Sequence, residues 1–271
     1  MGKKVNETKR IFAAIENGNA EMVKQMLCSG IDVNTRDENN ISLLHSAVCN
    51  GHAEIVKLLI DNGADVNAED DEKFIPLHYA VQNGKTEIVK ILLENGADAK
   101  RAEGMGLTPF GIAVLFFQEN ETMAKFMLQN GVDINAESDK GFAEIHLFSS
   151  LEDRADCVKF LLENGADINA KNTVNGSTAL HLAVRNSNFE TAKLLIENGA
   201  DINAVDEAGL TPLHYCARYT EDNKEMAELL IENGADLKAE SKIGSIPFHD
   251  AFIVGNFLLA RLLEQRSKIE G

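Results

Sequence analysis

The sequence predicts an all-α solenoid of stacked helix-turn-helix repeats joined by short hairpin-like fingers. Two phrases recur along the chain. One reads like NGADVNA, and its glycines recur at intervals of 33 to 35 residues: Gly30, Gly63, Gly96, Gly131, Gly165, Gly199 and Gly234. The other reads like TPLHYA, precedes the first by about twenty residues, and carries all four prolines and six of the seven histidines. A fixed period of this length is typical of repeat proteins, whose units bury their apolar faces only against their neighbours.

Each repeat is expected to start with a short helix at the proline position, because proline is tolerated in the first turn of a helix. In the third repeat this helix covers about residues 76–83. Six histidines follow two residues after the proline position: His45, His78, His146, His181, His214 and His249. We expect each to hydrogen-bond turn backbone at the start of its own helix. Equivalent residues of neighbouring repeats lie roughly 8–10 Å apart, so two of these rings cannot share a metal ion.

A second helix follows, as in AEIVKLLIDNG, where apolar residues from Ile55 to Ile60 have helical spacing. Asn-Gly ends this helix, with Gly63 free to take the left-handed conformation. DVNAEDDEKFI then forms an extended turn that leads to the next repeat. We expect recurring asparagines to fix this turn through side-chain to backbone hydrogen bonds. They are Asn67, Asn135, Asn169 and Asn203.

TPLHxA, GHxxIVxLL and NGADVNA at a 33-residue period together resemble the ankyrin repeat. The resemblance covers essentially the whole chain, read as one domain of eight repeats: residues 6–36, 37–69, 70–102, 103–137, 138–171, 172–205, 206–240 and 241–271. The first repeat lacks the TPLH phrase and the last lacks NGADVNA, so we expect caps whose outer faces meet water. The resemblance implies a non-catalytic module that binds another protein on its concave face through finger tips and first helices.

The charge balance narrows the class of partner. The chain carries 26 Lys and Arg against 43 Asp and Glu, a formal charge of −17. Such a chain repels nucleic acid phosphates and anionic membrane surfaces, so a neutral or basic protein is the expected partner. No signal peptide is recognisable, and no apolar run reaches the roughly 20 residues of a membrane span. The four cysteines form no CxxC pair. We expect a cytoplasmic monomer, with the nucleus or a host-cell cytosol as alternatives.

Catalytic motifs are lacking in the sequence. There is no GxSxG, HExxH or phosphate-binding glycine loop. Cys157 and His146 are eleven residues apart in a pattern that indicates no nucleophile pair. The acidic run at residues 69–72 lacks the spacing of a calcium loop. We therefore expect no enzymatic activity, no cofactor and no bound metal.

Two columns of residues are candidates for the partner-binding surface. The position just before each TPLH phrase is large and apolar in five repeats: Ile41, Phe74, Leu107, Phe142 and Leu210. The end of the first helix is polar in most repeats but carries Leu115, Phe116, Leu151 and Tyr219. We predict an apolar centre of Phe74, Leu107, Leu115, Phe116 and Phe142, flanked by acidic finger tips at Asp71, Glu72 and Glu207. The alternative is that the first column only packs finger against finger.

The middle of the chain is irregular. In repeat four, Gly111 replaces the histidine, and repeats four, five and seven carry one or two extra residues between their helices. We expect the extra residues to lengthen the first helix or the loop after it. They mark sequence drift, a docking site or a weak point of the stack.

Several biological roles are compatible with a binding module. An adaptor, targeting module or inhibitor is the main hypothesis. The abundance of Asn, Lys, Ile and Glu is also typical of an effector secreted by an intracellular bacterium or parasite to act on host proteins. A third role is the targeting domain of an enzyme whose catalytic part is absent. A small-molecule sensor would need basic side chains on the concave face, where the candidates are few, mainly Lys140, Arg185 and Arg218.

Overall fold

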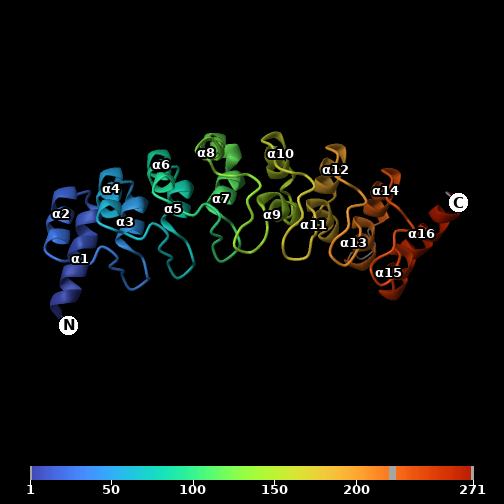
Figure 1. Cartoon of the computed structure of the whole chain (residues 1–271), viewed down its shortest axis with the longest axis horizontal. Helices are drawn as coiled ribbons and strands as arrows, with labels where there is room; N and C mark the ends of the chain where they lie inside the picture. Colours follow the sequence, from blue (N-terminus) through green and yellow to red (C-terminus); the bar gives the residue numbers. More distant parts are fainter. Residues whose placement is uncertain (1, 220–223, 270–271) are drawn as a thin grey trace. The chain divides into compact units, whose positions relative to one another are not determined.

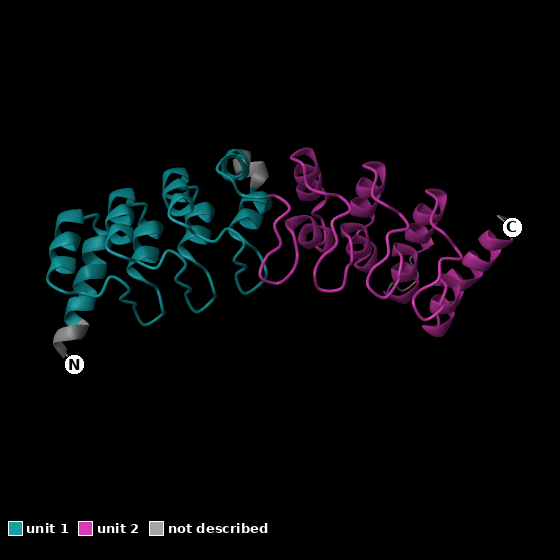
Figure 2. Ribbon diagram, in the orientation of Figure 1, with its two compact units in different colours: residues 1–133 teal, residues 134–271 magenta. Residues whose placement is uncertain are grey.

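The computed structural model describes residues 2–219 and 224–269, and only the backbone is described for residues 2–5, 117–121 and 269. It contains two compact units, residues 1–133 and 134–271, which Figure 2 shows in different colours. We describe each unit by itself.

Unit 1 contains four helix pairs (Figure 1). The first helices pack side by side in chain order, and the second helices form another layer, which lies above them in Figure 1. The first helices are α1 (Gly2–Glu16), α3 (Leu43–Asn50), α5 (Pro76–Gln82) and α7 (Pro109–Leu115). The second helices are α2 (Ala20–Cys28), α4 (Ala53–Asp61), α6 (Thr86–Glu94) and α8 (Phe117–Gln129).

Unit 2 repeats this arrangement with four further pairs. Its first helices are α9 (Glu144–Ser150), α11 (Ala179–Arg185), α13 (Pro212–Tyr219) and α15 (Pro247–Ile253). Its second helices are α10 (Ala155–Glu163), α12 (Phe189–Glu197), α14 (Lys224–Glu232) and α16 (Phe257–Ile269). The described residues contain no strand, and one isolated bridge joins Arg36 to Ser42. The predicted all-α repeat solenoid is therefore confirmed.

The recurring histidines close the first turn of their helices, as the sequence predicted. In repeat two, the Ser42 N–H donates to His45 Nδ1 at 3.3 Å, and Ser42 Oγ accepts from the His45 N–H at 3.2 Å. Because Nδ1 accepts, Nε2 carries the proton of the neutral ring. This Nε2 donates to the carbonyl of Phe74 in the next repeat at 3.1 Å. His45 thus links two repeats, a role that the sequence did not predict.

The same bridge recurs along both units. The Nε2 atoms of three further histidines donate to carbonyl oxygens of the following repeat at 2.9 to 3.3 Å: His78, His181 and His214. In repeat five, His146 Nε2 instead donates at 2.8 Å to the carbonyl of Ala170, near the end of its own repeat. Repeat four, the last of unit 1, has Gly111 at this position, where Thr108 Oγ1 accepts the Gly111 N–H at 3.0 Å. Its helix is capped, but no imidazole is available for a bridge.

The finger asparagines also join neighbouring repeats. Asn67 Nδ2 donates to the carbonyl of Gly96 at 3.1 Å, and Asn67 Oδ1 accepts the N–H of Asp98 at 2.8 Å. Asn135 and Asn203 each make the same two bonds to the glycine and aspartate of the repeat that follows them. Asn169 Oδ1 likewise accepts the Asp201 N–H. The expected side-chain to backbone hydrogen bonds are therefore present, but they run to the finger of the next repeat. Within its own turn the backbone is held by the preceding aspartate, since Asp65 Oδ1 accepts the Asn67 N–H at 3.0 Å.

The core is mainly aliphatic and continuous within each unit, and each helix pair contributes a few buried apolar side chains to it. In repeat two, for example, Ile55, Val56 and Leu59 of α4 are almost fully buried. A fully buried aliphatic side chain contributes roughly 1.5–3 kcal/mol, so each repeat adds a modest increment that is realised only by stacking. Gly63 ends α4 with φ +88°, as the Asn-Gly pattern predicted.

The extra residues of the middle repeats lie elsewhere than expected. In repeat four, α8 has 13 residues, whereas α4 and α6 have 9, and it starts directly after Phe116. The insertion therefore lengthens the second helix, not the first helix or its loop. In repeat five the connection at residues 151–154 forms a loop, as expected. The corresponding residues of repeat seven, 220–223, lie outside the described residues.

The two end repeats differ in their outer surfaces. Along α1, Asn6, Lys9, Arg10 and Glu16 are exposed, as expected for a cap. Repeat eight instead exposes large apolar side chains on α15, on α16 and in the turn between them. The outer surface of repeat eight is thus exposed, as expected of a cap, but it is apolar where that of repeat one is polar.

Candidate protein-binding surfaces

The residues of the first predicted column are half-buried or buried. The side chains of Ile41, Phe74, Leu107 and Phe142 are half-buried, and Leu210 is only 4% exposed. The prediction that Leu210 points along the surface was wrong, because the finger folds this side chain into the stack. The Phe74 ring lies 5.2 Å from the His78 ring and 5.3 Å from the Tyr79 ring, measured between centroids. Phe74 therefore packs against the first helix of its own repeat.

The second column is more exposed. Phe116 is 45% exposed and ends α7, and Leu115 beside it is half-buried. Phe116 lines a hollow of about 390 Å³. Ile112 of α7 and Met123 of α8 form further parts of its wall, and Gln82 and Asn83 at the end of α5 face them. A partly apolar hollow with amide groups at one side can receive an apolar side chain of another molecule.

Within unit 1, the predicted apolar centre divides into two places. Phe74 and Leu107 directly precede the N-cap residues of α5 and α7. Leu115 and Phe116 lie at the other end of α7. Because α5 and α7 pack side by side, Phe74 and Leu107 lie at one end of this helix layer. Leu115 and Phe116 lie at its other end.

The predicted acidic finger tips are exposed: Asp71, Glu72 and Glu207 all face solvent. Asp70, directly before Asp71, is buried, and its Oδ2 accepts the Tyr79 hydroxyl at 2.6 Å. Burial, together with this hydrogen bond, raises the pKa of Tyr79 above its ordinary value. Asp70 is thus a structural carboxylate, while its exposed neighbours are free to meet a partner.

Two predicted residues of unit 2 also lie on its surface. Leu151 follows α9 and is exposed, and Tyr219 ends α13 and is half exposed. The Arg185 guanidinium carbon lies 5.1 Å from the Tyr219 ring centroid, a cation–π contact between repeats six and seven. Part of the Tyr219 ring is therefore engaged within the protein.

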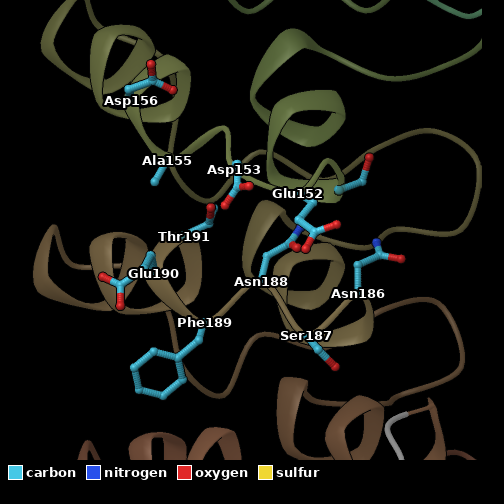
Figure 3. A pocket seen from close by; sticks show the side chains of 11 residues that line it. Glu152, Asp153, Ala155, Asp156, Asn186, Ser187, Asn188, Phe189, Glu190 and Thr191 are labelled. Atoms are coloured by element: carbon cyan, nitrogen blue, oxygen red, sulfur yellow. The ribbon is translucent and has the colours of Figure 1, made fainter.

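A groove in unit 2 was missed by the sequence reasoning (Figure 3). Its volume is about 740 Å³, and it lies between the helix-connecting turns of repeats five and six. Four of its lining side chains are acidic: Glu152, Asp153, Asp156 and Glu190. Asn188 Nδ2 joins the two turns by donating to the carbonyls of Ser149 and Leu151 at 2.9 and 3.1 Å. The extra residue between the helices of repeat five was the sequence signal that could have indicated this groove. It lengthens the turn that forms one side of the groove, in which Asp153 has φ +55°.

A family model for ankyrin repeats, described as covering three copies, matches residues 11–103, 70–138 and 145–241. The chain belongs to the ankyrin repeat family. No curated protein matches it. Ankyrin repeats are protein-interaction repeats, which agrees with the resemblance read from the sequence.

The polar groups inside these ankyrin repeats serve the fold. Burial lowers the pKa of His45, His78, His146 and His214, and it lowers the pKa of His181 to about 4. Neutral rings suit the bridges described above, because only a neutral ring can accept at Nδ1 and donate at Nε2. Burial also raises the pKa of Cys157 to about 12, which suppresses the thiolate that a nucleophile requires.

Among the described residues of this ankyrin repeat protein, His, Cys, Asp and Glu side chains form no group of three or more suited to a metal ion. None of the described helices combines the length and the apolar character that crossing a bilayer requires.

Proposed function

We propose that this ankyrin repeat protein binds a partner protein without catalysing a reaction, as an adaptor, targeting module or inhibitor. The observation that carries the proposal is Phe116, an exposed aromatic ring beside a hollow in unit 1. Three other repeats carry asparagine at this position: Asn50, Asn83 and Asn186. The repeat architecture therefore does not require an apolar side chain there.

The energetic value of such a contact can be worked out from the exposure of Phe116. Roughly half of the ring is open to solvent, on the order of 100 Å². Covering this area would contribute roughly 2 kcal/mol, or about a 30-fold change in affinity. Ile112 and Met123 extend the apolar surface, and Leu115 adds to it from the same helix end. Gln82 and Asn83 supply hydrogen-bonding groups at the rim.

The finger tips of each unit form the second part of the proposed surface. Ile41, Phe74 and Leu107 in unit 1 and Phe142 in unit 2 keep part of their side chains accessible. Exposed carboxylates at Asp71, Glu72 and Glu207 favour a basic partner. Such charges act mainly on the association rate, which should fall as salt screens them.

The proposal is tested with Phe116→Asn, which installs the residue of the sister repeats and so should preserve the fold. Val205→Asn, a surface change in repeat six, is the matched control. Proteins captured by the wild-type chain are identified, purified and titrated against all three proteins by calorimetry. We expect about 30-fold weaker binding for Phe116→Asn and unchanged binding for Val205→Asn.

The outcomes separate the site from the function. Equal affinity of Phe116→Asn and the wild-type chain for a purified partner would reject the Phe116 site but leave a binding module. If no captured protein binds the purified wild-type chain directly, the proposed function itself is rejected. An association rate that does not change with salt would reject the basic partner.

A further inference from the structure

Repeat eight exposes a contiguous apolar surface formed by the end of α15, the following turn and the start of α16. We call it the C-terminal patch; its residues are Phe252, Ile253, Val254, Phe257 and Leu258, and their exposed fractions range from 52 to 78%. The rings of Phe252 and Phe257 lie 5.6 Å apart between centroids, so the two helices present one surface. In Figure 1, α15 and α16 lie at one end of unit 2.

One residue of the C-terminal patch is explained by stacking. Phe252 occupies the position of Val184 and Ala217 in repeats six and seven, which are fully buried. In those repeats the side chain is covered by the stack. Its counterpart in repeat eight faces outward, so the exposure of Phe252 follows from the repeat architecture.

The other patch residues depart from the repeat pattern. Ile253 stands where repeats six and seven carry Arg185 and Arg218. Leu258 stands where five other repeats carry glutamate: Glu21, Glu54, Glu87, Glu190 and Glu225. Those positions are exposed or half-exposed in the sister repeats, so packing within the repeat does not demand an apolar side chain. Replacing charged groups by Ile and Leu on an outer surface indicates that another molecule covers them.

Charge favours a second copy of this chain as that molecule. Residues 241–271 carry four Lys or Arg and three Asp or Glu, whereas the whole chain carries 26 and 43. Of the acids in repeat eight, Asp250 is already paired with Arg218, at 2.7 Å between Oδ2 and Nε. Two copies of so acidic a chain repel each other over much of their surface. This repulsion is smallest where the nearly neutral repeat eight of one copy meets that of the other, and a strongly basic partner gains little there.

The geometry of the patch favours a two-fold arrangement. A head-to-tail contact would place the C-terminal patch against α1 of the next copy, where Lys9, Arg10 and Glu16 are exposed. That surface cannot match the apolar patch, but a second C-terminal patch can. In a two-fold contact the same surface of both copies meets itself, so each C-terminal patch is covered by the other.

We therefore propose that the C-terminal patch is a two-fold interface between two copies of this chain. Its five side chains expose on the order of 500 Å² of apolar surface in each copy. Two copies together would bury on the order of 1,000 Å², which is the lower end for a specific interface. The interface thus forms a weak, concentration-dependent dimer in place of the monomer expected from the sequence.

The test measures the mass of the full chain in solution by sedimentation velocity from about 1 µM to about 1 mM. The wild-type mass should rise from 29.6 kDa towards twice that value and then level off. The variant Ile253→Arg/Leu258→Glu carries residues that sister repeats already use at these positions, so it should keep its helical content. It should remain at 29.6 kDa throughout.

Two controls locate the interface. Ile243→Arg changes an exposed apolar residue in the finger of repeat eight, outside the C-terminal patch, and should leave the dimer intact. Phe116→Asn should do the same, which separates this interface from the proposed partner site. The proposal is overturned if the wild-type chain stays at 29.6 kDa at every concentration, or if the double variant dimerises as tightly as the wild type. Continued growth beyond two copies would also overturn it, because a two-fold contact closes.

Discussion

Replacing His181 by glutamine should destabilise unit 2 at neutral pH, and this loss should disappear on acidification. His181 is completely buried. Its Nδ1 accepts the Thr178 N–H at 3.2 Å, and its Nε2 donates to the carbonyl of Leu210 at 2.9 Å. The substitution leaves that buried carbonyl without its imidazole donor, which costs roughly 1–3 kcal/mol at pH 7.

The pH dependence follows from the pKa of His181. Burial lowers it from 6.5 to about 4, so the unfolded chain binds a proton at a higher pH than the folded chain does. The stabilising effect of the neutral ring is complete above pH 6.5 and is lost as the pH falls towards 4. For one histidine the loss amounts to about 2 kcal/mol at pH 5 and about 3 kcal/mol at full protonation. Glutamine does not titrate, so the variant escapes this loss.

The measurement compares urea unfolding of the two proteins, followed by circular dichroism at pH 7, 6 and 5. The wild type should be more stable by roughly 1–3 kcal/mol at pH 7, and the gap should close near pH 5. Carboxylate titrations affect both proteins equally and cancel in the difference. His249→Gln is the control, because His249 holds the same position in repeat eight but is exposed. A gap that stays constant from pH 7 to pH 5 would refute the neutral, bridging role of His181.

Three further predictions concern stability and thiol reactivity. Asn203→Ala removes both hydrogen bonds to the next finger and should lower the free energy of unfolding by about 1–2 kcal/mol in urea melts, unlike the exposed control Asn39→Ala. Arg218→Ala leaves the carboxylate of Asp250 buried without its cation and should cost about 3 kcal/mol, measured the same way. Cys157 should react with a thiol reagent only when the chain unfolds, because its thiol is buried. In the native chain only the two exposed cysteines should be modified promptly, and prompt modification of more than two would contradict the burial of Cys157.

Much of the fold could be predicted from the sequence because the residues that mark helix starts and helix ends recur in most repeats. Pro76 and Pro109 mark helix starts, and Gly63 marks a helix end through its left-handed backbone. These signals depend on residues only a few positions apart. The insertion of repeat four was recognised as well, but its place in α8 could not be, since either neighbouring helix can absorb two residues without breaking its hydrogen-bond pattern.

The candidate surfaces were harder to predict, because exposure depends on what the next repeat covers. Leu210 and Phe116 are both apolar residues at positions that the repeat pattern left open. The stack buries the first and leaves nearly half of the second accessible. The same limit applies to repeat eight, where the sequence suggested an ordinary cap although Leu258 had replaced a recurring glutamate.

Period, helix type and family therefore follow from the chain alone, since they rest on contacts within about 35 residues that recur in every repeat. Only the tertiary structure shows that His181 Nε2 and the Asn203 amide donate to backbone carbonyls of the next repeat. It likewise decides which apolar side chains remain in contact with water. Both depend on the neighbour's backbone in three dimensions, because a repeat's own residues do not specify the surface that is laid against it.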